Sequence, residues 1–118
     1  MTETVTRATF ESQRQGARRI RRRDMNMLAV ISVTLGLAQL ALIRWADSTL
    51  SRPLELTVAG GVFLAYITLI GALLWRMERR YRAACPRCPA CGRTLIGMSD
   101  RVAAATGRCD ACGGQIIG

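Results

Sequence analysis

The sequence predicts a membrane α-helical hairpin, made of two transmembrane helices, followed by a small C-terminal module rich in β-structure. Three observations predict this fold class. Two apolar stretches, 25–43 and 56–75, contain no charged residue and are each about as long as the apolar layer of a bilayer is thick. A short polar connection, 44–55, separates them and makes them antiparallel neighbours. All the cysteines of the chain follow residue 84.

The first segment, 1–24, is rich in arginine and poor in large apolar side chains. Seven arginines stand against three acids, and Val5, Phe10 and Ile20 are the large apolar residues before the methionines. These three lie on no helical stripe, so we expect a tail that contributes no core and becomes helical only near 15–23. Arginines beside a spanning helix interact with anionic lipid head groups at about 1 kcal/mol each, so the lipid surface is a predicted partner.

The first apolar stretch, 25–43, contains Asn26 and Gln39 as its only strongly polar side chains. At roughly 1.5 Å per residue such a stretch spans about 28 Å as a helix. A soluble protein of this size could not cover a helix that is apolar on every face, so we predict the first transmembrane helix here. The long polar segment before it and the second apolar stretch after it argue against a cleaved signal peptide.

The second apolar stretch, 56–75, spans about 30 Å as a helix and predicts the second transmembrane helix. Ser51 is placed to cap its start, with Pro53 in the first turn. The basic linker 76–87 follows, and its helix-forming residues predict that the helix continues to about Ala84.

Small or hydrogen-bonding side chains form one stripe along each apolar helix. Small residues let helix backbones approach closely in lipid, where packing replaces the hydrophobic effect. We expect the two stripes to face each other or a partner, which is either another protein subunit or a second copy of this chain. The stripes comprise Ser32, Gly36 and Gln39 on the first helix and Gly61, Ala65, Thr68 and Ala72 on the second.

The arginines also predict the orientation in the membrane. Fifteen of the seventeen lie before or after the two apolar stretches, whereas the connection 44–55 balances two arginines with two acids. The positive-inside rule therefore places both termini in the cytoplasm and the connection outside, across an inner or cytoplasmic membrane. The cysteines agree with this orientation, because thiols stay reduced in the cytoplasm.

The cysteines form two Cys-x-x-Cys pairs, each followed by glycine: CPACG at 88–92 and CDACG at 109–113. Two cysteines three apart on a tight turn direct their sulfurs into one small volume, and glycine suits a turn with positive φ. Two such pairs supply four thiolates to one tetrahedral ion. The predicted metal ligands are Cys88, Cys91, Cys109 and Cys112.

A fifth cysteine, Cys85, permits a second frame in which 85–88 forms the first pair. The frame with Cys88 and Cys91 is preferred because glycine then follows the second cysteine of both pairs. In the rival frame that position is Pro89, which has no N–H to offer the turn. Cys85 is then a spare thiol at the hinge between helix and module, or an alternative ligand.

The segment 88–118 resembles a zinc ribbon of the four-cysteine type, in which two such turns sit at the tips of short β-hairpins. The resemblance implies a structural Zn²⁺ ion. After the turns we expect short strands at 93–96 and 115–117 and a flexible loop at 97–105. A module this small would not fold unaided, whereas a structural zinc contributes about 10 to 16 kcal/mol in small domains. Nearly all of its apolar content is Leu95, Ile96, Val102, Ile116 and Ile117.

We expect a binding protein and not an enzyme. The chain has no histidine, no activated serine arrangement and no paired acids beside a predicted cleft, and the metal would occupy the thiolates. A membrane anchor that carries a cytoplasmic module held together by a metal ion is typical of an accessory or assembly subunit, or an adaptor, of a membrane complex.

Two other functions remain open at this stage. The first is a membrane-tethered zinc ribbon that binds nucleic acid, although the module has no aromatic residue on which bases could stack. Its contacts would come from Arg87, Arg93, Arg101 and Arg108. The second is a rubredoxin-like iron electron carrier, whose metal-binding turns are similar but whose aromatic core has no counterpart after Tyr81.

Overall fold

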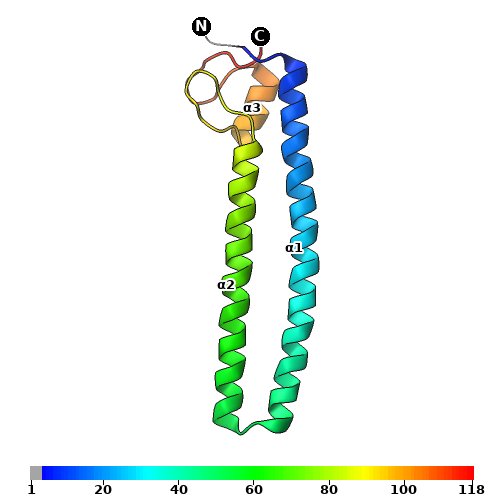
Figure 1. Cartoon of the computed structure of the whole chain (residues 1–118). Helices are drawn as coiled ribbons and strands as arrows, with labels where there is room; N and C mark the ends of the chain where they lie inside the picture. The colour runs from blue at the N-terminus through cyan, green and yellow to red at the C-terminus, as the bar shows by residue number, and fades with distance from the viewer. Residues whose placement is uncertain (1–3) are drawn as a thin grey trace. The chain divides into compact units, whose positions relative to one another are not determined.

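The structure, a computed structural model of the chain, describes residues 4–118 (Figure 1). The described residues form three helices: α1 (Arg7–Thr49), α2 (Arg52–Ala84) and α3 (Met98–Thr106). The chain divides into two compact units. One unit, here called the head, comprises Met1–Arg22 and Glu78–Gly118, and the other, the hairpin, comprises Arg23–Met77.

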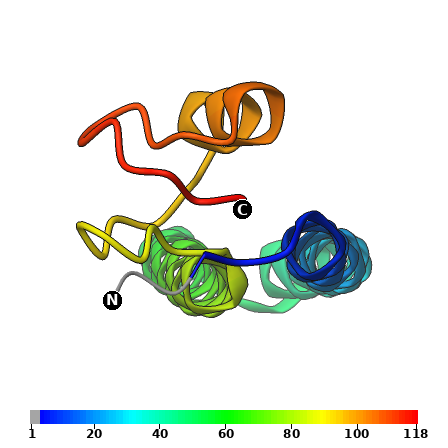
Figure 2. The same ribbon diagram turned by 90° about the horizontal axis from the view of Figure 1, so that it is seen from above.

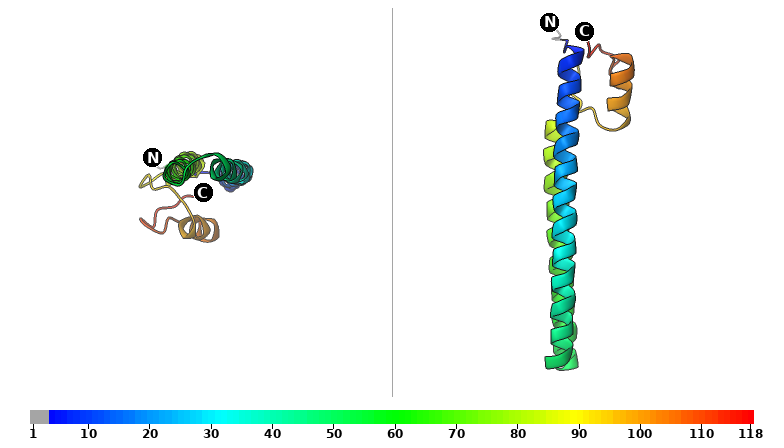
Figure 3. Two further views of the ribbon diagram at one scale, coloured as in Figure 1. Left: turned by 90° about the horizontal axis from the view of Figure 1, so that it is seen from below. Right: turned by 90° about the vertical axis from the view of Figure 1, so that its right-hand side faces the viewer.

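In the hairpin, α1 and α2 run antiparallel and side by side, as the two views in Figures 1 and 3 show. Half-buried or buried residues recur along each helix at spacings of three and four, which places them on one face. This pattern is typical of two helices packed along their length. The facing residues include Leu28, Ile31, Leu35, Gln39 and Ala46 of α1 and Val62, Tyr66, Ile70, Leu73 and Met77 of α2.

Both long helices contain a stretch that is long and apolar enough to cross a membrane. None of the residues in these two stretches is buried within the chain. The predicted limits of the second helix are confirmed, since α2 starts at Arg52 with Pro53 in its first turn and ends at Ala84. The predicted connection 44–55 is largely helical, because only Leu50 and Ser51 lie between the two helices.

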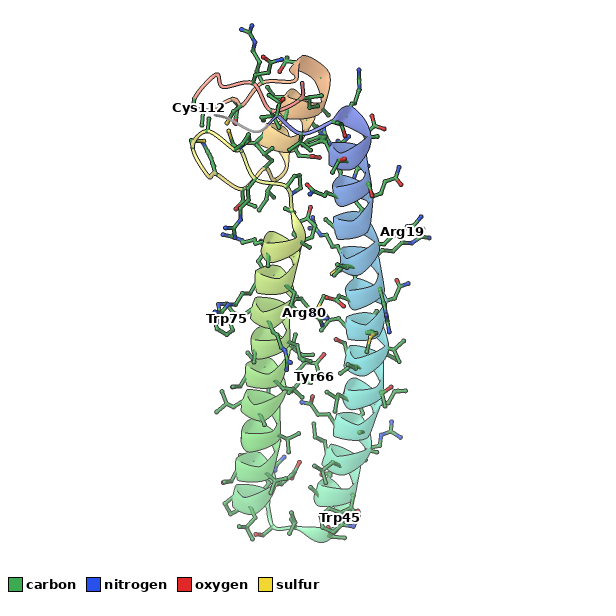
Figure 4. All side chains as sticks on the ribbon, turned by 45° about the horizontal axis from the view of Figure 1, so that its top comes forward. Arg19, Trp45, Tyr66, Trp75, Arg80 and Cys112 are labelled. Atoms are coloured by element: carbon green, nitrogen blue, oxygen red, sulfur yellow. The ribbon has the colours of Figure 1, made fainter. Side chains whose placement is uncertain are left out.

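The two stripes of small residues lie on different faces. Gly36 and Gln39 are half-buried on the inner face of α1, whereas the whole stripe on α2 is exposed. Gln39 of the first stripe and Ala65 of the second both line a cavity of about 280 Å³, together with Tyr66 and other residues. The Tyr66 side chain points toward α1, and Trp75 points away from it (Figure 4). The exposed stripe is therefore left for a partner or for lipid.

The head has its own small core. The core residues come from α1, from the two cysteine turns, from α3 and from the C-terminal segment. They are Phe10, Cys88, Leu95, Ala103, Cys109 and Ile116, with Val5, Ala104 and Ile117 packed against them. Seen from above, the C-terminal segment passes beside α3 toward the N-terminal residues (Figure 2), and Val5 pairs with Ile117 in a parallel bridge.

The prediction that the N-terminal tail contributes no core is wrong. Phe10 is 1% exposed and is among the largest fully buried side chains in the described part of the chain. Helix α1 also begins at Arg7, well before 15–23. The sequence pattern hid this role because Phe10 stands alone, and one ring is enough to fill a core this small.

The prediction of a β-rich module with a loop at 97–105 also needs correction. Within residues 4–118 there is no extended strand, and the predicted strands at 93–96 and 115–117 are reduced to isolated bridges. Helix α3 takes the place of the loop. Three successive alanines in α3 favour helix, and Gly107 ends it in the left-handed conformation at φ 70° while donating to the carbonyl of Ala103.

The head core predicts a clear stability difference between two substitutions. Leu95→Ala removes a side chain that is 1% exposed, and we expect it to destabilise the head by about 2 to 5 kcal/mol. Met98→Ala, at a position 73% exposed, serves as the matched control and should change stability by less than about 0.5 kcal/mol. Denaturant unfolding of the metal-loaded full chain in detergent measures both, and equal effects would contradict the core described above.

Candidate metal centre

The two Cys-x-x-Cys turns fold in the same way. In the first, the N–H of Gly92 donates to the carbonyl of Cys88 at 2.8 Å, and the N–H of Cys88 donates to the carbonyl of Arg93 at 2.9 Å. In the second, the N–H of Gly113 donates to the carbonyl of Cys109 and the N–H of Cys109 donates to that of Gly114, both at 2.9 Å.

The bridges that close the turns are equivalent as well. The first turn lies between the antiparallel bridge partners Arg87 and Thr94, and the second lies between Arg108 and Gln115. Each bridge starts one residue before the first cysteine of its pair, so the two turns are copies of one local structure. The zinc-ribbon resemblance implied a β-hairpin at each pair, and the structure has a short turn closed by one bridge at each place.

Glycine is required after each pair. Gly92 has φ 71° and Gly113 has φ 68°, a left-handed conformation that costs other residues roughly 1 to 2 kcal/mol. Gly114 has a different role, because a Cβ there would lie 3.0 Å from the Cβ of Ala90 and 3.2 Å from the sulfur of Cys112. The absence of a side chain at Gly114 therefore lets the two turns approach each other.

The structure brings the sulfurs of Cys88, Cys91, Cys109 and Cys112 into one cluster, with all four within 4.8 Å of one another. The sulfur of Cys88 lies 3.7 Å from that of Cys112, and the sulfur of Cys91 lies 3.9 Å from that of Cys109. Four sulfurs bound tetrahedrally at about 2.3 Å from zinc would be about 3.8 Å apart. The spacing of the thiols thus fits a metal ion at the centre.

The cluster is half inside the head and half at its surface. Cys88 and Cys109 are buried, whereas Cys91 and Cys112 are exposed. The label in Figure 4 marks Cys112 on its turn in the head. The buried pair belongs to the apolar core, so the packing of the head fixes one side of the site and solvent reaches the other.

Electrostatics in the cluster favour a cation. Burial opposes ionisation of Cys88, but the N–H groups of Cys91 and Ala90 and the neighbouring thiols lower its pKa to about 7. At Cys112 the N–H of Gly114 favours the thiolate, yet the three neighbouring cysteines together raise its pKa to about 12. Cys88 and Cys112 therefore resist being ionised at the same time. A divalent cation would relieve the repulsion between their thiolates.

Cys85 lies outside the cluster. It is buried at the end of α2 and shares a hydrogen bond with Tyr81. Burial and the nearby carboxylates of Asp100 and Glu78 raise the pKa of the Cys85 thiol, although the Tyr81 bond and Arg21 act the other way. The four cysteines brought together are those of the preferred frame, and Cys85 has the surroundings of an unreactive structural thiol.

Two polar residues that the sequence did not single out support the second turn. The hydroxyl of Ser99, at the start of α3, donates to a carboxylate oxygen of Asp110 at 2.7 Å. This bond ties α3 to the turn that holds Cys109 and Cys112. Ser99 was placed in a loop by the sequence pattern, so no signal linked it to the metal ligands.

The arginines proposed for nucleic-acid contact are all exposed in the head. Comparison of the chain with protein families, with curated proteins and with solved structures finds no match.

The thiol cluster predicts that metal affinity rises with pH. The pKa of about 12 at Cys112 means that this thiol is protonated at neutral pH, so a metal must displace its proton. At lower pH, protons compete more strongly with the metal for the thiolates. We therefore expect the apparent metal affinity to rise at least about tenfold per pH unit between pH 6 and 8.

Chelator competition on the purified full chain at several pH values measures this dependence. The variant Cys85→Ser is the control and should give the same slope, because Cys85 lies outside the cluster. An affinity independent of pH would contradict binding through these thiols.

Proposed function

We propose that this protein is a small integral membrane protein that holds a binding module, stabilised by a zinc ion, at the cytoplasmic face. It acts as an accessory or assembly subunit or an adaptor of a membrane complex. The observation that carries the proposal is the four-sulfur cluster in a head continuous with two long apolar helices.

Membrane insertion is supported by the exposure of the apolar stretches. The core helix of a soluble protein is mostly buried by the rest of its chain, whereas no residue in either apolar stretch is buried here. A two-helix pair can cover only one face of each helix, and the remaining faces carry exposed Leu37, Leu40, Phe63, Leu64 and Leu74. Lipid is the environment in which such faces are stable.

The cytoplasmic orientation is supported by the arginines and by the thiols. Exposed arginines flank the apolar stretches at the ends that continue into the head, including Arg22, Arg23, Arg76 and Arg80. The side with more positive charge stays in the cytoplasm during insertion. Reduced thiols, which metal binding needs, persist in the same compartment.

Zinc is the ion we propose for the site. Four thiolates leave no open coordination position, which is typical of a structural zinc and excludes a water activated on the metal. Within the described residues, the head core contains one aromatic ring, Phe10, and lacks the aromatic packing expected around a rubredoxin-like iron. The ion would hold the two turns together, and the surface of the head would bind the partner.

A binding role is supported by exposed surfaces on the head and on the hairpin. On the head, Met98 is 73% exposed and the arginines at 87, 93, 101 and 108 lie at the surface. On the hairpin, the small-residue stripe of α2 is exposed. These surfaces offer one contact for a cytoplasmic partner and one for a helix in the membrane.

Purification of the full chain in a gentle detergent tests the proposal. We expect one zinc per chain and a stoichiometric partner or self-assembly. In the double variant Cys91→Ser/Cys112→Ser, which removes the two exposed ligands, zinc and the cytoplasmic partner should both be lost.

The matched control is Cys85→Ser, which should keep zinc and partner because this thiol lies outside the cluster. A zinc-loaded protein that comes without any stoichiometric partner or self-assembly would count against an adaptor. Partner binding that survives loss of the metal would show that the head does not provide the binding surface.

A further inference from the structure

One face of the N-terminal part of α1 packs within the head. Phe10, Arg14, Ala17 and Arg21 follow one another at spacings of four, three and four, so they lie on one side of the helix. Phe10 is 1% exposed and Ala17 is 4% exposed. The other side of this segment is exposed, including Arg19, which points away from the head core (Figure 4).

Phe10 occupies the same core as two of the predicted metal ligands. The buried cluster contains Phe10 together with Cys88 and Cys109, one cysteine from each turn. Any rearrangement of the turns therefore changes the packing around this ring. Phe10 and the metal site share one set of buried contacts, although 78 residues separate Phe10 from Cys88 in sequence.

Polar contacts at three positions, Val5, Arg14 and Arg21, join the same segment to the rest of the head. The N–H of Val5 donates to the carbonyl of Ile116 at 3.0 Å, and the N–H of Gly118 donates back to Val5 at 3.2 Å. The guanidinium of Arg14 donates to Asp100 of α3 at 2.7 Å.

The third position is Arg21. Its guanidinium lies 4.9 Å from the centre of the Tyr81 ring on α2. Together these contacts give the segment a defined position against the C-terminal residues, α3 and the end of α2.

Arg18 adds an ion pair with Asp100 at 3.9 Å, and the apolar burial of the segment is small. Between residues 4 and 22, only Phe10 and Ala17 are buried, and both are buried within the head. Within residues 4–118 the head core contains six buried residues, and a core this small contributes little stability without a metal that fixes the turns. Loss of the metal would therefore remove the surface on which Phe10 and Val5 pack.

We infer that metal binding at the four cysteines controls the attachment of residues 4–22 to the head, so that the site works as a metal-dependent latch on the N-terminal end of α1. This inference rests on the metal site of the proposed function. Because α1 is one continuous helix from Arg7 to Thr49, the latched segment is also the direct extension of the first membrane helix.

Thermodynamic linkage makes the latch reciprocal. If metal binding strengthens the docking of Phe10, the docking of Phe10 must raise the metal affinity by the same factor. A residue far in sequence from every cysteine should then affect metal affinity. A segment that merely rests on the head would have no such effect.

Hydrogen exchange of the full chain in detergent, with zinc and after its removal by a chelator, tests the latch directly. We expect the amides of residues 4–14 to lose protection together with those of residues 107–118 when zinc leaves. Residues 28–42 of the hairpin serve as an internal reference and should not change. If residues 4–14 keep their protection in the metal-free protein, the latch is overturned while the metal site stands.

A second measurement uses Phe10→Ala, with Ile20→Ala as the matched control on the exposed side of the same helix. Coupling between sites is typically about 5- to 150-fold, so we expect Phe10→Ala to weaken zinc at least about fivefold in chelator competition. Ile20→Ala should change affinity less than about twofold. Equal affinities for Phe10→Ala and wild type would overturn the latch, and a wild-type chain that takes up no zinc would overturn the metal site itself.

Discussion

The mutual repulsion of four thiolates in one small volume is the constraint on which the head depends. Two short turns place the sulfurs 3.7 to 3.9 Å apart across the cluster, a separation that suits a shared cation and opposes four free negative charges. In the described part of the chain the head core contains six buried residues, and a core of this size contributes little stability by itself. A metal ion bound by the four sulfurs would relieve this repulsion and stabilise the head.

The position of the cluster then explains the rest of the head. Cys88 and Cys109 form part of the core together with Leu95, Ile116 and Phe10, so a bound ion would lie beside the core and not at a detached tip. Helix α3 braces one turn through Ser99 and holds Arg14 through Asp100. The module therefore includes the start of α1 as well as the C-terminal residues, and segments that are distant in sequence share one core.

The sequence predicted those features that have a local cause. Apolar length identifies the two long helices, Pro53 and the helix formers near Ala84 mark the limits of α2, and Cys-x-x-Cys-Gly identifies the turns. The sequence did not predict the features that depend on tertiary packing. Phe10 carries no periodic signal, since its partners come from the far end of the chain, and no pattern assigned it to a core.

Helix α3 is a different kind of failure. Its alanines and Gly107 favour a helix, whereas the prediction for 97–105 is a flexible loop between two short strands. The small-residue stripes show a further limit. Their spacing is correct for a helix face, yet the sequence could not indicate that the stripe on α1 faces inward and the stripe on α2 outward.

X-ray absorption at the zinc edge of the purified full chain is the measurement that tests the central claim most directly. We expect a single shell of four sulfur neighbours at about 2.3 Å, with no nitrogen or oxygen ligand. A mixed shell that includes oxygen or nitrogen, or a first shell with fewer than four sulfurs, would contradict a closed site built from Cys88, Cys91, Cys109 and Cys112.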